Sequence, residues 1–491
     1  MIGAAMAANR WNELVWSSDH DRTSLSRAAG RGTLARLSPG LYTSAVADAP
    51  SDVVRRNLHA IVAHELPGAV IADRSARHGG KPIDGELYVV HRRDRPLVLP
   101  GVTILARPGP SGLERDIPLG GGLFIASEAR TLLESLQRPA GRRLSRDEVE
   151  GWIDELSASG GGRRLNSVRD LARTIAPALR ANAALDTLDA LISASLQTGD
   201  ARIVTNERLA ARSAGIGYDQ ARIDLFTAFA DRLRDRAPGA IVQIPDDAPR
   251  RAMLPFYEAY FSNFIEGTEF TLEEAERIVF HGDVPDDRPD DAHDIVGTYS
   301  IVTDPARRAL VADSADEFNA LLRDWHGEVM GGRPDKRPGE FKHLGNRAGV
   351  TEFVAPDLVE GTLRRGFETG TGLIDPFQRA VYAMFVIAEV HPFLDGNGRV
   401  ARIAMNAELS AGGLVRLIIP TVLRLNYIAA LKAATLHGDF KALIAVAEYA
   451  QRYTARVDFT TLESAERILT MTNALRDPYD AEQAGVRLEL P

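Results

Sequence analysis

The sequence predicts a multi-domain, predominantly α-helical protein with an α/β module at its N-terminus, and three observations lead to this class. The chain has 491 residues, more than one hydrophobic core can use, so about two to four domains are expected. Short β-prone segments are concentrated before residue 110, whereas apolar residues recur at helical spacing through most of the rest. The hydrophobic fraction of 45% and the charged fraction of 25% are those of an ordinary globular protein.

The composition excludes several kinds of protein. Cysteine is absent, so disulfides, thiolate catalysis and cysteine metal sites are excluded, and a reducing cytoplasm is the expected compartment. Residues 1–16 lack a basic stretch followed by a continuous apolar one, so no signal peptide is expected. The most apolar stretch, 413–423, is broken by Arg416 and Pro420, so no membrane-spanning segment is expected either.

The first expected domain covers residues 1–110. The Ser-Pro-Gly turn within 37–42 lies between short apolar pieces and predicts a small hairpin, like the wing of a winged helix. An amphipathic helix is expected over 52–66, followed by strands at 69–71, 86–90 and 102–105. This domain carries 14 Lys and Arg against 10 Asp and Glu, while the whole chain has a net charge of −9. A slightly basic module permits contact with nucleic acid.

The rest of the chain is expected to be helical apart from one hairpin. Residues 111–245 predict a helical connecting domain, with helices at 186–196 and 218–236 and loops at 138–141 and 160–162. Proline-rich pieces at 237–239 and 245–249 predict a linker into a domain over 246–455. That domain should contain helices at 254–266, 292–302 and 314–330, and a β-hairpin within 339–354. The final part, 456–491, predicts one helix at 461–475 and an acidic tail.

The chemistry is concentrated in residues 391–402. Apolar spacing over 375–390 and 400–409 predicts two helices, with a tight glycine-containing loop between them. A helix N-terminus attracts phosphate, and glycines let the backbone approach it closely. Arg399 and Arg402 are three residues apart, so both can reach one anion. Asp395 can hold a hard cation such as Mg²⁺, and His391 is the nearby group that can take a proton near neutral pH.

This segment resembles the signature of the Fic family, His-Pro-Phe-x-(Asp/Glu)-Gly-Asn-Gly-Arg-x-x-Arg, and matches it at every defined position. Members of the family mostly transfer AMP from ATP to a hydroxyl group on a target protein. The resemblance implies that His391 is the general base and that Asp395 is the Mg²⁺ ligand. It also implies an anion cradle, two phosphate-binding arginines and a residue near the adenine, namely Gly396, Asn397, Gly398, Arg399, Arg402 and Tyr427.

A second motif lies at the end of the helix expected over 254–266. Ser262 and Glu266, followed by glycine, resemble the Fic inhibitory motif, (Ser/Thr)-x-x-x-Glu-(Gly/Asn). The resemblance implies that Glu266 pairs with Arg402 and so blocks binding of the γ-phosphate. Ser262 lies one turn earlier and is expected to support the carboxylate. The simpler alternative is that Glu266 only ends a helix before a glycine. The hairpin within 339–354 resembles the Fic flap, on which a target protein docks as an added strand.

The N-terminal region is similar to AbiEi-type antitoxins, which are bacterial transcriptional regulators. The similarity covers about residues 5–200 and rests on the stretches 37–42 and 126–133. It implies DNA binding, with a set of arginines as phosphate contacts: Arg22, Arg27, Arg31 and Arg36. The alternative is a scaffold for protein contacts in which these arginines form a solvated face.

Together these observations predict a cytoplasmic protein adenylyltransferase that uses ATP and Mg²⁺ and modifies a target protein or itself. Glu266 is expected to inhibit it by pairing with Arg402, within one chain or across a homodimer. One alternative is a nucleotide-sensing transcriptional regulator or antitoxin. Another is a Fic enzyme that transfers a different group or removes AMP already installed. Protein-bound label from α- or γ-labelled ATP distinguishes these alternatives.

Overall fold

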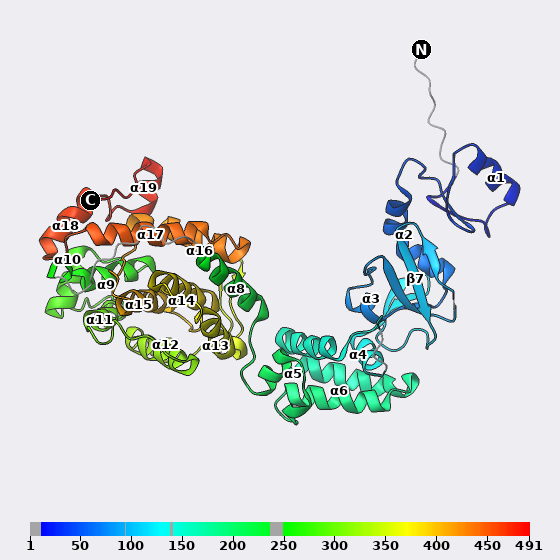
Figure 1. Ribbon diagram of the computed structural model, residues 1–491, viewed down its shortest axis with the longest axis horizontal. Coiled ribbons are helices and arrows are strands. Elements are labelled where there is room, and N and C mark those ends of the chain that lie inside the picture. The colour runs from blue at the N-terminus through cyan, green and yellow to red at the C-terminus, as the bar shows by residue number, and fades with distance from the viewer. Residues whose placement is uncertain (1–10, 94, 138–140, 236–248) are drawn as a thin grey trace, which may run out of the picture. The chain divides into compact units, whose positions relative to one another are not determined.

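The computed structural model describes residues 11–93, 95–137, 141–235 and 249–491, and the chain forms two compact units, Met1–Gly215 and Ile216–Pro491 (Figure 1). Most of the predicted linker at 237–249, the predicted loop at 138–140 and the first ten residues lie outside the described residues. Within the described ranges, no helix combines the length and the apolar character needed to cross a membrane.

The first unit begins with a three-stranded antiparallel sheet of order β1-β3-β2 and a single helix. These elements are β1 (Leu14–Trp16), α1 (Arg22–Gly30), β2 (Ala35–Ser38) and β3 (Leu41–Thr43). Asp21 begins α1 because its side chain accepts a hydrogen bond from the Ser24 N–H. The predicted hairpin is present, because β2 pairs with β3 in antiparallel fashion, and it turns at Gly40, whose φ is +88°. The winged-helix resemblance of this module stays a prediction.

A six-stranded mixed sheet follows, with the order β6-β7-β5-β4-β9-β8. Its strands are β4 (Val70–Ile71), β5 (Glu86–Val90), β6 (Leu97–Leu99), β7 (Val102–Arg107), β8 (Ile117–Gly120) and β9 (Leu123–Ile125), with helices α2 (Pro50–Glu65) and α3 (Asp73–Arg77). The pairs β5–β7 and β4–β9 are parallel, and the other pairs are antiparallel. Val53, Ile61 and Leu87 belong to the buried cluster that joins α2 to the sheet. The sequence predicted β4, β5 and β7, but not β9 or the two edge strands, β6 and β8.

The first unit ends in a helical part with its own core. Its helices are α4 (Glu128–Gln137), α5 (Arg146–Leu179), α6 (Asn182–Ser195) and α7 (Glu207–Ser213). At the loop predicted over 160–162, α5 is interrupted at Gly161, where φ is +58° and ψ is −158°, and helix continues on either side of this non-helical residue. Glycine allows this local break, and the helix resumes because Leu165, Val168 and Ala172 are buried on the far side of it.

The second unit is helical apart from one small hairpin (Figure 1). Its main helices are α8 (Gln220–Arg234), α9 (Leu254–Ile265), α10 (Leu272–Glu276), α11 (Pro289–Thr303), α12 (Ala315–Val329), α13 (Val359–Gly370), α14 (Pro376–Val390), α15 (Asn397–Ala411), α16 (Arg424–His437), α17 (Lys441–Arg456), α18 (Leu462–Met471) and α19 (Pro478–Ala484). Helices α14 and α15 lie side by side in the middle of this unit. The aromatic rings of Phe229 on α8 and Phe385 on α14 are 4.8 Å apart, so α8 shares the core of the second unit although it precedes residue 246.

Two elements differ from the sequence prediction. The hairpin consists of β10 (Arg347–Ala348) and β11 (Thr351–Glu352), so it turns at Gly349 and Val350. The glycines at 345 and 349 suggested a turn centred slightly earlier, within 345–349. Gly349 has a φ of +61°, which a glycine adopts without strain. The acidic tail contains a short helix, α19, because the Asp477 side chain accepts hydrogen bonds from two N–H groups of its first turn and Ala481 is buried.

Candidate active site

The predicted catalytic loop joins the C-terminus of α14 to the N-terminus of α15. His391 is the last residue of the α14 turn and has a left-handed backbone, with a φ of +51°. Pro392 cannot continue the helix, because it lacks an N–H. Gly396 precedes α15 with a φ of +72°, and a side chain there would come within 2.7 Å of the Met330 sulfur. The loop therefore needs glycine at this position for both conformation and space.

Side chains from inside the unit hold the loop in shape. Asn397 accepts a hydrogen bond from the Phe393 N–H at 2.8 Å and donates one to the Phe393 carbonyl at 3.0 Å. The His326 ring stacks on the buried Phe393 ring at 3.8 Å. Its Nδ1 accepts from the Gly339 N–H, so its Nε2–H donates to the Asp395 carbonyl at 3.1 Å. The side chain of Asn397, a predicted cradle residue, bonds the Phe393 backbone, so its backbone N–H is the group left to bind an anion.

His391 is poised as a neutral base. Its Nδ1 lies 3.3 Å from the Ala388 carbonyl, which can only accept, so Nδ1 carries the proton and Nε2 has a free lone pair. The Phe353 ring stacks on the imidazole at 3.9 Å. Burial lowers the pKa of His391 to about 4, because the charged imidazolium is poorly solvated there. The ring is therefore unprotonated at neutral pH and can take a proton.

The N-terminus of α15 is suited to an anion. Its N-cap, Gly396, has no side chain to satisfy the first N–H groups of the helix. These groups and the helix dipole favour a negative charge. Asp395 lies next to this terminus, half-buried, and its Oδ1 accepts from the Gly396 N–H at 2.7 Å. No group of three or more His, Asp or Glu side chains that could hold a metal occurs in the described ranges.

Glu266 occupies the place where an anion would be favoured. Its Oε1 accepts a hydrogen bond from Arg402 Nη2 at 2.7 Å, and both residues belong to the same chain. A Cβ on Gly398, the second residue of α15, would collide with this oxygen, so the carboxylate lies against the helix backbone. Burial alone would raise the pKa of Glu266, but the charge and hydrogen bond of Arg402 hold it below its usual value. Glu266 is therefore ionised at neutral pH.

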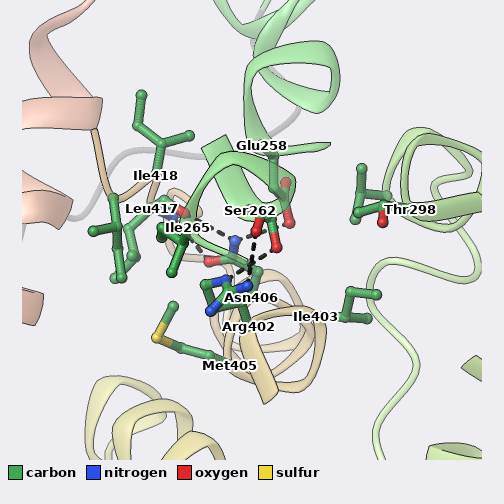
Figure 2. A pocket seen from close by; sticks show the side chains of 12 residues that line it. Glu258, Ser262, Ile265, Thr298, Arg402, Ile403, Met405, Asn406, Leu417 and Ile418 are labelled. Carbon is green, nitrogen blue, oxygen red and sulfur yellow. Dashed lines mark hydrogen bonds between the residues drawn. The ribbon is translucent and has the colours of Figure 1, made fainter. Parts of the chain in front are cut away.

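Helix α9 packs against α15 along one side of the site and is held there by hydrogen bonds. Glu258 and Ser262 lie four residues apart on one face of α9, and Glu266 follows four residues later, just beyond the end of the helix. Glu258 accepts a hydrogen bond from Asn406 at 2.8 Å, and the Ser262 hydroxyl accepts one from Arg402 Nε at 3.0 Å (Figure 2). The cavity between these side chains has a volume of about 10 Å³, room for about one water molecule. It is part of this packed interface and is too small for a nucleotide.

The structure places Ser262 differently from the sequence expectation. Its hydroxyl accepts from Arg402 Nε, while its carbonyl and Glu266 Oε1 both accept from Arg402 Nη2. Helix α9 ends at Ile265, so Glu266 lies in the turn beyond it. Ser262 therefore supports the arginine of the pair rather than the carboxylate.

The two arginines of the signature have separate acidic partners. Arg399 Nη1 donates to Asp294 on α11 and, at 3.3 Å, to Asn263 on α9. Asp294 also accepts from Arg333 at 3.0 Å. Both partners of the Arg399–Asp294 pair are fully buried. In this state the two guanidinium groups do not converge on one anion position.

Tyr427, the residue expected near the adenine, lies on α16 and is buried. Its hydroxyl donates to the Met384 sulfur at 2.9 Å. Burial raises its pKa, so the hydroxyl stays neutral. Arg402 lies against this hydroxyl and opposes the rise in its pKa, so Tyr427 contacts the site as well as the core, and its nucleotide role remains a prediction.

Several residues of the site could not be found from the sequence. Asp294, His326 and Arg333 come from helices or turns far from the loop in the sequence, and no local pattern marks them. A histidine on an apolar helix face is usually a satisfied core residue, and His326 is one, although it shapes the catalytic loop. Only the fold brings these side chains to the loop.

Comparison with known proteins agrees with this geometry. Residues 318–409 match the Fic/DOC family, and this range includes the whole catalytic loop. The protein adenylyltransferase fic-1 of Caenorhabditis elegans is 27% identical over 238 residues, which cover 46% of this chain and 46% of that protein. The protein adenylyltransferase Fic of Drosophila persimilis is 30% identical over 201 residues, 38% of each chain. The chain therefore spans less than half the length of these curated relatives.

Among solved structures, Fic-1 from C. elegans aligns over 66% of this chain and 92% of its own length, with 18% sequence identity and a TM-score of 0.35. The range 318–409 excludes α8, α9 and α11, which supply Arg222, Glu266 and Asp294.

Proposed function

We propose that this protein is a cytoplasmic protein adenylyltransferase that transfers AMP from ATP to a hydroxyl side chain of a target protein or of itself. One observation carries the proposal: a neutral His391 lies beside a glycine-lined helix N-terminus whose anion position is filled by the protein's own Glu266. The names of the similar proteins, protein adenylyltransferases, support the same chemistry.

In the proposed reaction, His391 Nε2 takes the proton from the target hydroxyl. The hydroxyl oxygen then forms a bond with the α-phosphorus, and the bond from that phosphorus to the oxygen bridging to the β-phosphate breaks. Pyrophosphate leaves with its charge spread over its oxygens. Such reactions depend mainly on positioning and on charge stabilisation. A well-placed base contributes about 10²- to 10⁴-fold.

The residues present fit a Mg²⁺ ion. Asp395 is half-buried at the N-terminus of α15, and Mg²⁺ is usually held by one or two carboxylates together with substrate phosphates. Asp395 would hold the ion, which would supply charge neutralisation to the phosphates.

The phosphates would bind at the start of α15, on the backbone N–H groups of Asn397 and Gly398, and on that of Gly396 once Asp395 Oδ1 leaves it. A phosphate oxygen could take the position of the Glu266 carboxylate because Gly398 has no side chain there. Arg402 would then exchange Glu266 for the γ-phosphate, and Arg399 would reach the β-phosphate only by leaving Asp294. Inhibition by Glu266 follows from this competition for one guanidinium.

The hairpin β10–β11 would receive the target. Both of its strands have unpaired edges in the described part of the chain, and Val350 at its turn is 89% exposed. An extended segment of the target could pair with one edge, which would bring one hydroxyl to His391. The Phe353 ring on His391 links the hairpin to the base.

The test uses the Glu266→Gly variant with ATP labelled at the α- or at the γ-phosphate. We expect protein-bound label from the α-position only, and loss of that label in the Glu266→Gly/His391→Ala double variant. Label from the γ-position would instead indicate phosphate transfer. Loss of label from a protein that was modified beforehand would indicate removal of AMP.

A second candidate function concerns the first unit. Four exposed arginines lie on α1, on the turn after it and on β2, namely Arg22, Arg27, Arg31 and Arg36. We propose that this face contacts DNA phosphates, as in a transcriptional regulator. A gel shift with promoter DNA that weakens steeply with salt would support it, and binding that does not change when these arginines are replaced would exclude it.

A further inference from the structure

Helix α8 lies outside the residues that match the Fic/DOC family, yet one of its side chains reaches two elements beside the catalytic loop. Arg222, near the start of α8, is mostly buried, and its two terminal nitrogens have different partners.

The first partner is Glu389, at the end of α14. Arg222 Nη1 donates to Glu389 Oε2 at 2.6 Å. Glu389 is 2% exposed, and its other oxygen accepts from the Thr435 hydroxyl. A carboxylate buried this deeply needs a charged or hydrogen-bonded partner. Glu389 stands two residues before His391, so this pair fixes the helix end that carries the base.

The second partner is the backbone of the hairpin. Arg222 Nη2 donates to the Glu352 carbonyl at 2.8 Å, at the end of β11. The next residue is Phe353, whose ring stacks on His391 at 3.9 Å with an angle of 6° between the planes. One guanidinium therefore bonds both the helix that ends in His391 and the strand that leads to the ring covering it.

The other side of the hairpin is held without α8. The Lys342 N–H donates to the Pro392 carbonyl at 2.8 Å, and Asn346 Nδ2 donates to the Phe393 carbonyl at 2.9 Å. These contacts anchor the segment that leads into β10 to the catalytic loop itself. The second strand has its contact with α8 through Arg222, so loss of that side chain should loosen this strand selectively.

We propose that Arg222 is a positioning residue: by bonding Glu389 and the Glu352 carbonyl at the same time, it holds β11 in register so that Phe353 covers His391. This rests on the proposed function for the role of His391, but its test does not require AMP transfer.

The test compares deuterium uptake by the backbone of residues 347–353 in four proteins: wild type, Arg222→Lys, Arg222→Met/Glu389→Gln, and Arg232→Met as a control. Arg232 is an exposed arginine on the same helix. The double variant replaces Arg222 and Glu389 together. No unpaired charge is then left buried, so the variant can fold. Lysine can bond one of the two partners but lacks the fork needed for both. We expect exchange about 2- to 10-fold faster in both Arg222 proteins, the effect of one lost hydrogen bond, and no change in the control.

Titration of His391 by NMR gives a second readout. Loosening of Phe353 should let water reach the ring and raise its pKa from about 4 toward the ordinary 6.5. The charged groups that face the ring, Lys342, Glu266 and Asp395, are the same in all four proteins. Exchange and titration in both Arg222 proteins equal to those of Arg232→Met would overturn the proposal. A loosened hairpin in a protein that shows no transfer would refute the proposed function and leave this inference standing.

Discussion

Each unit contains a buried arginine paired with an acid, and the two pairs differ in how far the acid is exposed to solvent. We call a pair closed when both side chains are fully buried. In the first unit, Arg130 and Asp116 have fully buried side chains joined at 2.6 Å, and Arg130 also bonds Glu134 and two backbone carbonyls. In the second unit, Arg402 is also buried, with 6% of its side chain exposed, but the side chain of its partner Glu266 is 26% exposed and lies beyond the end of α9. A closed pair holds structure, whereas an acid with one side open to solvent can be displaced by a ligand.

The largest effect should come from breaking the closed network. Arg130→Met leaves the buried Asp116 without its cation and Glu134 with Arg107 alone, and losses of a buried partner cost about 3–5 kcal/mol. We expect the free energy of unfolding of the first unit to fall by that amount in urea titrations. A change below about 1 kcal/mol would mean that the network is not closed in solution.

The same contrast can be tested within the active site. Asp294→Asn weakens the fully buried partner of Arg399 and Arg333, so we expect a loss of about 3 kcal/mol in unfolding free energy. Glu266→Gln removes the partly exposed partner of Arg402 and should cost about 1 kcal/mol. Equal costs for the two substitutions would remove the distinction between a structural acid and a displaceable one.

A smaller effect is expected at Ser262. Ser262→Ala removes the hydroxyl that holds Arg402 Nε, while Glu266 stays in place. Arg402 should then leave α9 more readily, and label transfer should rise about 2- to 10-fold, as for one hydrogen bond. A fall in transfer would show that Ser262 prepares Arg402 for phosphate rather than restraining it.

The last effect concerns pH. The pKa of His391 is about 4 when folded, below the ordinary 6.5, so the unfolded chain binds more protons between these values. Stability from this group is therefore present above pH 6.5 and is lost as the pH falls toward 4. His326, with a pKa of about 4, acts in the same direction. Unfolding titrations at several pH values should show this slope, and His391→Ala should reduce it.

The sequence predicted the parts of the site that depend on local pattern. Helix spacing and the order helix, loop, helix around His391 follow from neighbouring residues, and the structure has both. The sequence could not show that Arg399 faces Asp294, because the two lie on different helices whose packing decides the contact. The Arg222 contacts have the same origin, since they join segments that only the folded core brings together.

The kink in α5 and the turn of the hairpin show a different limit. Glycines at 160–162 and 345–349 suggested loops, because glycine permits many backbone conformations. Which of those conformations is adopted depends on the burial of residues nearby, such as Leu165 after the kink. Composition therefore located both irregular places without giving their geometry.

The claim that Glu266 blocks transfer by pairing with Arg402 is tested most directly by the initial rate of transfer from α-labelled ATP. The rate is compared for the wild type, Glu266→Gly and Glu269→Gly. Glu269 is an exposed acid in the same turn, without a bond to Arg402 in the described part of the chain. The account predicts a rate about 10- to 100-fold above wild type for Glu266→Gly, as for one charge-assisted hydrogen bond, and an unchanged rate for Glu269→Gly. Equal rates for wild type and Glu266→Gly, or the same rise in both variants, would contradict it.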